Sequence, residues 1–197
     1  YAAQGDRLAA IGDLRAALAL EPNHAAAHTM LYALIQQAGD PRAVESQLDA
    51  SIASSPNQSG PYASRGDFLL RQGRMDEALR DFDKALQLSA DNTHALTMRA
   101  NVYILQAKFA AAEADLTRSL GLDPRQPIAF TLRGTARIHL GHPDPAIQDY
   151  QTAVTFNSES AEAHHDLGFA QFCDRDYPAA QAAFDTAYRL DPSKAYL

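Results

Sequence analysis

The sequence predicts an all-α protein of tandem helix-turn-helix hairpins stacked into a solenoid, and three observations carry this prediction. Prolines recur in one register, with Pro22, Pro56, Pro124 and Pro192 at spacings of 34, 68 and 68 residues, and a fixed period of this length indicates a repeat architecture. Within each period, apolar residues recur at spacings of three and four, which is typical of amphipathic helices. Alanine is abundant, tryptophan is absent and only 8% of residues are aromatic, which favours closely packed helices over a β-sandwich.

Two columns of residues keep the 34-residue register without insertion or deletion. Twelve residues before each proline slot lies a small residue, and a large apolar residue follows four positions later. We infer that the small column lets the two helices of a hairpin approach closely, so a bulky residue in it should cost about 1–3 kcal/mol through overpacking. The small column reads Ala10, Val44, Ala78, Ala112, Ala146 and Ala180, and the large column reads Leu14, Leu48, Phe82, Leu116, Tyr150 and Phe184.

Taken in order, the predicted repeats begin with a partial repeat at 1–24, which holds the end of one helix and a complete second helix. A divergent repeat follows at 25–58, in which Asp40-Pro41 is a helix-start signal, a capping residue followed by proline at the first helical position. Because neither end of the chain resembles a polar cap, we expect the chain to be a segment of a longer protein. The remaining repeats lie at 59–92, 93–126, 127–160 and 161–194, and 195–197 is expected to start a further helix.

The pattern within the repeats resembles the tetratricopeptide repeat (TPR) family over essentially the whole chain. Residues 161–194 carry His164, Leu167, Gly168, Ala180, Phe184 and Pro192, and residues 59–92 carry Tyr62, Gly66, Ala78 and Phe82. The sequence departs from the family where His28, Leu96 and His164 fill an aromatic slot and where Tyr32 replaces a small residue. The resemblance implies a right-handed superhelical solenoid that acts as a non-enzymatic scaffold for protein–protein interaction.

The tripeptide Arg65-Gly66-Asp67 also spells a motif that cell-adhesion receptors bind. Such a motif needs an exposed loop, whereas the repeat pattern predicts these residues in the middle of a helix. Gly66 occupies the same close-contact column as Ala100, Gly134 and Gly168. We therefore interpret the tripeptide as part of the helical packing.

Three repeats carry an arginine in a slot where the family usually has leucine, and an aspartate sixteen residues later. The two complete repeats that keep Leu31 or Leu167 in this slot have Gln47 or Ala183 at the second position. This covariation predicts partly buried ion pairs between the two helices of one hairpin; the alternative is three arginines that line a binding site. The pairs are Arg65 and Asp81, Arg99 and Asp115, and Arg133 and Asp149.

The resemblance further implies that the first helix of each repeat lines a concave groove. The side chains expected there are mostly neutral, with threonine and methionine prominent, so we predict that the groove binds a neutral or apolar peptide segment. Phe169 and Phe172 could anchor such a segment, or pack beneath a following helix. The candidate groove residues are Thr29, Met30, Ala33, Ala63, Ser64, Asp67, Arg71, Thr97, Met98, Asn101, Thr131, Leu132, Thr135, Ile138, His165, Asp166, Phe169 and Phe172.

A carboxylate clamp for chaperone tails is not expected. Family members with this clamp use lysine, arginine and asparagine at fixed groove slots, and Asn101 is the one clear match here. The slots expected to hold lysine contain Thr29, Ala63, Thr97 and Thr131.

Several other classes of function find no support in the sequence. A net charge of −7 with scattered basic residues argues against nucleic-acid binding, and no apolar run is long enough to span a bilayer. Cys173 and His165 are eight residues apart on one helix, too far for a catalytic dyad. His24 and His28 lack further ligands for a metal. No catalytic, cofactor-binding or metal-binding residues are assigned.

We therefore predict a non-enzymatic interaction scaffold whose partner is a protein or peptide segment. Two alternatives remain: a structural array that self-associates through its open ends, and a regulatory arm of an enzyme located outside these residues. The sequence leaves bacterial cytoplasm and periplasm both open as compartments.

Overall fold

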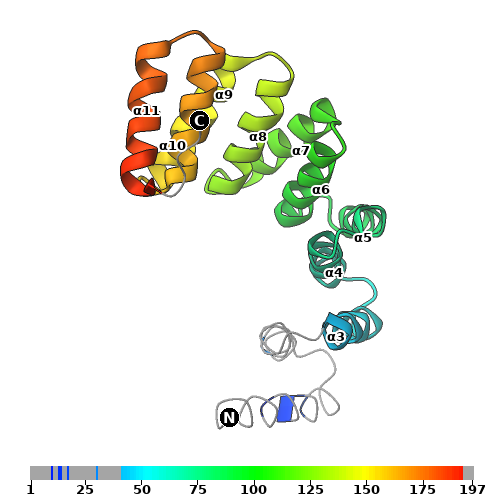
Figure 1. Ribbon diagram of the computed structural model, residues 1–197. Helices are drawn as coiled ribbons and strands as arrows, with labels where there is room; N and C mark the ends of the chain where they lie inside the picture. The colour runs from blue at the N-terminus through cyan, green and yellow to red at the C-terminus, as the bar shows by residue number, and fades with distance from the viewer. Residues whose placement is uncertain (1–9, 11–12, 15–16, 18–29, 31–40, 193–197) are drawn as a thin grey trace. The chain divides into compact units, whose positions relative to one another are not determined.

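The computed structural model describes residues 41–192 continuously, together with residues 10, 13–14, 17 and 30. Every regular element in this part of the chain is helical (Figure 1), which confirms the all-α prediction. The helices with complete bounds are α3 (Pro41–Ser54), α4 (Ser59–Arg71), α5 (Met75–Leu88), α6 (Thr93–Leu105), α7 (Phe109–Leu122), α8 (Pro127–His139), α9 (Pro143–Phe156), α10 (Ala161–Cys173) and α11 (Tyr177–Leu190).

The chain divides into two compact units, an N-terminal unit (Tyr1–Asn92) and a C-terminal unit (Thr93–Leu197). In the N-terminal unit, α4 and α5 form a hairpin and α3 packs against α4. The C-terminal unit contains the hairpins α6/α7, α8/α9 and α10/α11 (Figure 1), with α8 packed on α7 and α10 packed on α9. The start signal read at Asp40-Pro41 agrees with α3, which begins at Pro41; Asp40 itself lies outside the described residues.

The core of each hairpin is built from the two columns that the sequence repeats. Ala78 and Ala112 are fully buried, and so are the large residues Phe82 and Leu116 that follow them. Tyr150 is buried in the same slot in α9, with its hydroxyl group hydrogen-bonded to Thr135 across the hairpin at 3.0 Å. Burial of these side chains between helices supplies the hydrophobic stabilisation of a fold without sheets.

Glycine in the first helix of a hairpin coincides with an aromatic ring in the second. A Cβ added at Gly66 would lie 2.7 Å from the Phe82 ring, and one at Gly134 would lie 2.8 Å from the Tyr150 ring. The hairpin α6/α7 has Ala100 in the glycine slot, and there the facing residue is Leu116. The ring, not the helix backbone, therefore requires glycine at these positions.

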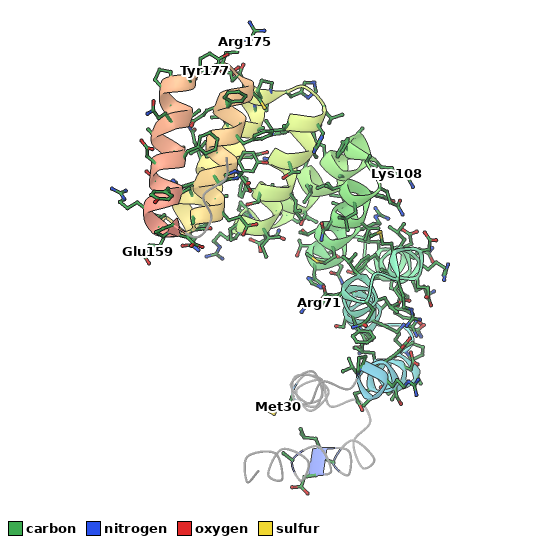
Figure 2. All side chains as sticks on the ribbon, viewed as in Figure 1. Met30, Arg71, Lys108, Glu159, Arg175 and Tyr177 are labelled. Carbon is green, nitrogen blue, oxygen red and sulfur yellow. The ribbon has the colours of Figure 1, made fainter. Side chains whose placement is uncertain are left out.

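Each described turn within a hairpin contains one residue in the left-handed region of backbone space. These residues are Gly73 and Gly141, with φ of 76° and 78°, and Ala107 and Arg175, with φ of 56° and 67°. Arg175 is labelled in Figure 2 at the turn between α10 and α11. A side chain at such a φ is strained, whereas glycine adopts it readily.

Ala107→Gly and Arg175→Gly should therefore each stabilise the protein, by about 0.5–1 kcal/mol, because the strain in the native turn exceeds the extra entropy that glycine loses on folding. Urea unfolding monitored by circular dichroism measures this difference. Gly141→Ala is the matched control, since no atom lies within 4 Å of an added Cβ and only backbone strain should lower its stability. A loss of stability in both Ala107→Gly and Arg175→Gly would contradict the prediction.

Candidate functional site

The described candidate groove residues of the N-terminal part are Met30 and side chains of α4. Thr29 lies outside the described residues, and Met30 is an exposed residue in a helical position. Ser64 is exposed on α4, while Asp67 accepts a hydrogen bond from Arg71 at 3.1 Å. Arg71 is mostly exposed near the end of α4 (Figure 2), so its pair with Asp67 is a surface ion pair.

The C-terminal unit contains a shallow pocket between the first turns of α6 and α8. Its volume is about 210 Å³. Of the candidate residues, Thr97 and Met98 line it. Ile128, 62% exposed at the start of α8, also lines it, although the sequence analysis did not select this residue. The full lining is Thr93, His94, Thr97, Met98, Gln126, Pro127, Ile128 and Ala129.

Thr97 is a correction to the predicted groove, because its side chain is buried and not presented to solvent. The residue is only 4% exposed, and its hydroxyl group lies 2.9 Å from the Ser119 hydroxyl and 3.2 Å from Gln126 Oε1. Ser119 in turn donates to the Thr93 carbonyl oxygen at 3.1 Å. Thr97 thus belongs to the floor of the pocket, where its polar group is already satisfied.

Gln126 fixes the wall of this pocket. Its amide nitrogen donates to the backbone carbonyls of Ser119 and Asp123, at 3.2 and 2.8 Å. These bonds tie the connection between α7 and α8 to the end of α7. These bonds, with the contact between Thr97 and Gln126, shape the pocket at the first turn of α8.

The other candidates on α8 make apolar contacts or hydrogen bonds within the C-terminal unit. Leu132 packs against the core cluster around Leu116, and Ile138 packs beside Ala146. Thr135 donates to the Thr131 carbonyl oxygen at 3.0 Å and shares a hydrogen bond with Tyr150. Burial raises the pKa of the Tyr150 hydroxyl group, so this partner stays protonated.

Four candidates lie on α10, away from the pocket lining. His165 lies 3.4 Å from Asp166, and its ring is 5.5 Å from the ring of Phe184, centroid to centroid. Phe169 and Phe172 are both exposed. They do not contribute to the pocket between α6 and α8. On α6, Asn101 is half-buried and is also not part of the lining.

The three arginine–aspartate pairs each form two hydrogen bonds across a hairpin. Arg65 donates to Asp81 at 2.7 and 2.8 Å, and this contact raises the pKa of the arginine. Arg99 donates to Asp115 at 2.7 and 2.8 Å. The third pair joins Arg133 and Asp149, at 3.0 and 2.7 Å. None of the three arginines lines the pocket.

Arg65 and Arg133 also contact the helix that precedes their hairpin. Arg65 Nη1 donates to Asp49 of α3 at 2.8 Å, and Arg133 Nη1 reaches Thr117 of α7 at 3.5 Å. Both acceptors lie sixteen residues before the arginine. These contacts link consecutive hairpins, and the sequence analysis did not foresee them.

The Arg65-Gly66-Asp67 tripeptide lies inside α4, with Gly66 buried against Phe82. Over the described residues, no group of three or more histidine, cysteine, aspartate and glutamate side chains is placed to hold a metal ion. In that same part of the chain, each helix is too short or too polar to cross a membrane.

Comparison with known proteins assigns the chain to a family. Two family models described as tetratricopeptide repeat match residues 36–93 and 69–135. Tetratricopeptide repeat protein 6 of Homo sapiens is 33% identical over 67 residues, which are 34% of this chain and 13% of that protein. The chain therefore spans only a small part of the length of this relative. It belongs to the tetratricopeptide repeat family, and its repeats make it a scaffold for protein interaction.

Solved structures show the same fold. PilF of Pseudomonas aeruginosa superposes with a TM-score of 0.82 at 23% identity, over 98% of this chain and 88% of that chain. MamA of Desulfovibrio magneticus RS-1 gives 0.74 at 22% identity, over 86% and 96%. YrrB, described as a TPR protein with an unusual peptide-binding site, gives 0.71 at 17% identity, over 92% and 93%.

Proposed function

We propose that the C-terminal unit binds a neutral or apolar peptide segment of a partner protein and inserts one apolar side chain into the pocket between α6 and α8. The observation that carries this proposal is the pocket itself, whose lining includes the apolar side chains of Met98, Pro127, Ile128 and Ala129. At about 210 Å³ it is smaller than the roughly 300–1,000 Å³ of typical small-molecule sites. A single large side chain suits it better than a whole cofactor.

The absence of charged side chains in the lining indicates that the bound peptide segment is neutral at the pocket. No aspartate, glutamate, lysine or arginine lines the pocket, so a charged side chain buried there would lack a partner and would lose solvation. Met98 supplies a flexible and polarisable wall that adapts to irregular apolar groups. A carboxylate clamp would need lysine or arginine at this site, and neither residue type lines the pocket.

The fold relatives support the same class of ligand. YrrB shares the repeat fold and is described as having a peptide-binding site. The free energy of peptide binding would come from apolar contact and from the fit of the inserted side chain.

The test uses a phage-displayed library of random peptides, selected on the native chain, followed by fluorescence anisotropy with a selected peptide. Ile128→Glu places a charge at the mouth of the pocket and should weaken binding by about tenfold or more. Leu122→Glu is the matched control, since Leu122 is similarly exposed at the end of α7 but does not line the pocket. Binding that is lost equally in both variants, or a failure to select any peptide with an apolar anchor, would contradict the proposal.

A further inference from the structure

The lining of the pocket between α6 and α8 includes one side chain that can gain or lose a proton near neutral pH. This side chain is His94, which is exposed in the first turn of α6. Met98 lies four residues further along, so both side chains lie on the same face of the helix. A peptide whose apolar side chain contacts Met98 would therefore also cover part of the imidazole ring.

The two helices that pack against α6 within the C-terminal unit, α7 and α8, carry no acidic side chain at the ends that flank the pocket. The last turn of α7 (119–122) and the first turn of α8 (127–130) contain no charged residue. The next charged residues along these helices are Arg118 and Arg133, which are both cations. Over the described residues, the His94 ring forms no hydrogen bond, ion pair or aromatic contact. A proton on this ring would therefore create a charge without a partner.

Charged residues also lie in the connections next to the pocket. Asp123 and Arg125 lie between α7 and α8, and the Asp123 carboxylate accepts a hydrogen bond from the Arg125 backbone nitrogen at 2.9 Å. Asp91, which precedes α6, forms a hydrogen bond with Ser89. The first turns of α6 and α8 add the positive ends of two helix dipoles, and these disfavour a further positive charge at this end of the unit.

We propose that His94 makes peptide binding at this pocket pH-dependent, because the apolar segment binds beside the neutral imidazole and its binding is weakened when the ring is protonated. The inference rests on the proposed function, since it concerns the peptide held between α6 and α8. An apolar segment laid over a protonated imidazole excludes water from the ring and offers it no carboxylate. The same exclusion of water strengthens the repulsion between the imidazolium and the two helix N-termini.

The direction of the effect follows from the protons that are bound in each state. Because the bound peptide disfavours the protonated ring, binding displaces a proton from His94 wherever the free side chain carries one. The affinity is therefore highest near pH 8 and falls as the pH drops through the range in which histidine titrates, about pH 5 to 8. A segment with a carboxylate beside its apolar anchor would show the opposite dependence, because the carboxylate would pair with the imidazolium.

The probe is a rhodamine-labelled peptide with blocked ends, selected on the native chain from a library without ionisable side chains, so that only the protein titrates. Anisotropy measures its affinity for the full chain at about pH 7.5 and about pH 5.5. The native chain should bind it about three- to tenfold more weakly at the lower pH. His94→Gln, which stays polar but cannot become charged, should bind with the same affinity at both. His142→Gln is the matched control and should keep the native pH dependence, since His142 is exposed before α9 and does not line the pocket.

Equal affinity of the native chain at the two pH values, or tighter binding at the lower one, would overturn the inference and leave peptide binding at the pocket intact. A pH dependence that His94→Gln retains would also overturn it, because another group would then titrate. Circular dichroism should be the same at both pH values; a loss of helical signal at the lower pH would assign the weaker binding to unfolding. A probe that binds at neither pH, or whose binding Ile128→Glu leaves unchanged, would contradict the proposed function and with it this inference.

Discussion

Arg99→Leu is expected to destabilise the C-terminal unit by about 2–4 kcal/mol, because it removes both hydrogen bonds that Asp115 receives while the carboxylate stays mostly buried. In the variant, the Asp115 carboxylate is neither fully solvated nor paired with a cation, and this desolvation lowers the stability of the folded state. Chemical unfolding measures the change in the unfolding free energy. It is monitored by circular dichroism, because the sequence has no tryptophan for fluorescence detection.

The double variant Arg99→Leu/Asp115→Ala should recover much of that loss, since it removes the unpaired charge as well. Arg71→Leu is the matched control: the ion pair of Arg71 with Asp67 lies at the surface, so its removal should cost at most about 1 kcal/mol. Equal unfolding midpoints for Arg99→Leu and the native chain would show that the pair contributes nothing.

Gly66→Ala is the second substitution with a large expected effect. The new methyl group would meet three atoms of the Phe82 ring at 2.7 to 3.0 Å, and this ring is fully buried. The overpacking should cost about 1–3 kcal/mol and outweigh the gain of up to about 1 kcal/mol in helix propensity. Thermal melting compares the variant with the native chain.

The hairpin α6/α7 suggests the compensating change, because it combines Ala100 with Leu116 in the same two slots. Gly66→Ala/Phe82→Leu should therefore be more stable than the sum of the two single variants predicts, since the smaller leucine makes room for the methyl group. Gly60→Ala, in the same helix but with open space around its added Cβ, should be neutral or stabilising. A lower melting point for Gly60→Ala than for Gly66→Ala would contradict this reasoning.

The hairpins and their cores could be predicted from the sequence because the chain contains several copies of the same 34-residue helical hairpin. A period of 34 residues fixes which side chains face the partner helix, and it placed Ala78, Phe82, Ala112 and Leu116 in columns that are buried. Comparison between repeats also singled out Arg99 and Asp115, since residues that change together across copies tend to be in contact.

The pocket could not be predicted in the same way. Its walls depend on the connection between α7 and α8, which the bonds from Gln126 to Ser119 and Asp123 shape. Repeat spacing indicates which residues share a helix face, but not how far the first turn of α8 stands from α6. This is why Thr97 was expected to be exposed and why Ile128 was not selected.

The contacts between consecutive hairpins were missed for a simpler reason. The repeat pattern argues against pairing each aspartate with the arginine of the following repeat, because Asp149 would then face Leu167, and the corresponding slot in α3 is occupied by Gln47. The acceptor of Arg65 in the preceding hairpin is Asp49, two residues further along. On a helix this shift of two residues rotates the side chain by about 200° and brings it to the following hairpin.

The most direct test of peptide binding at the pocket is methyl nuclear magnetic resonance of the full chain during titration with a selected peptide. The largest shifts should fall on Met98 and Ile128, with smaller ones on the neighbouring Thr97 and Ala129, because these four residues line the pocket. The methyl groups of Val44 and Ile147, which lie outside it, should stay unchanged. Shifts confined to other methyl groups, with Met98 and Ile128 unaffected by saturating peptide, would contradict binding at this site.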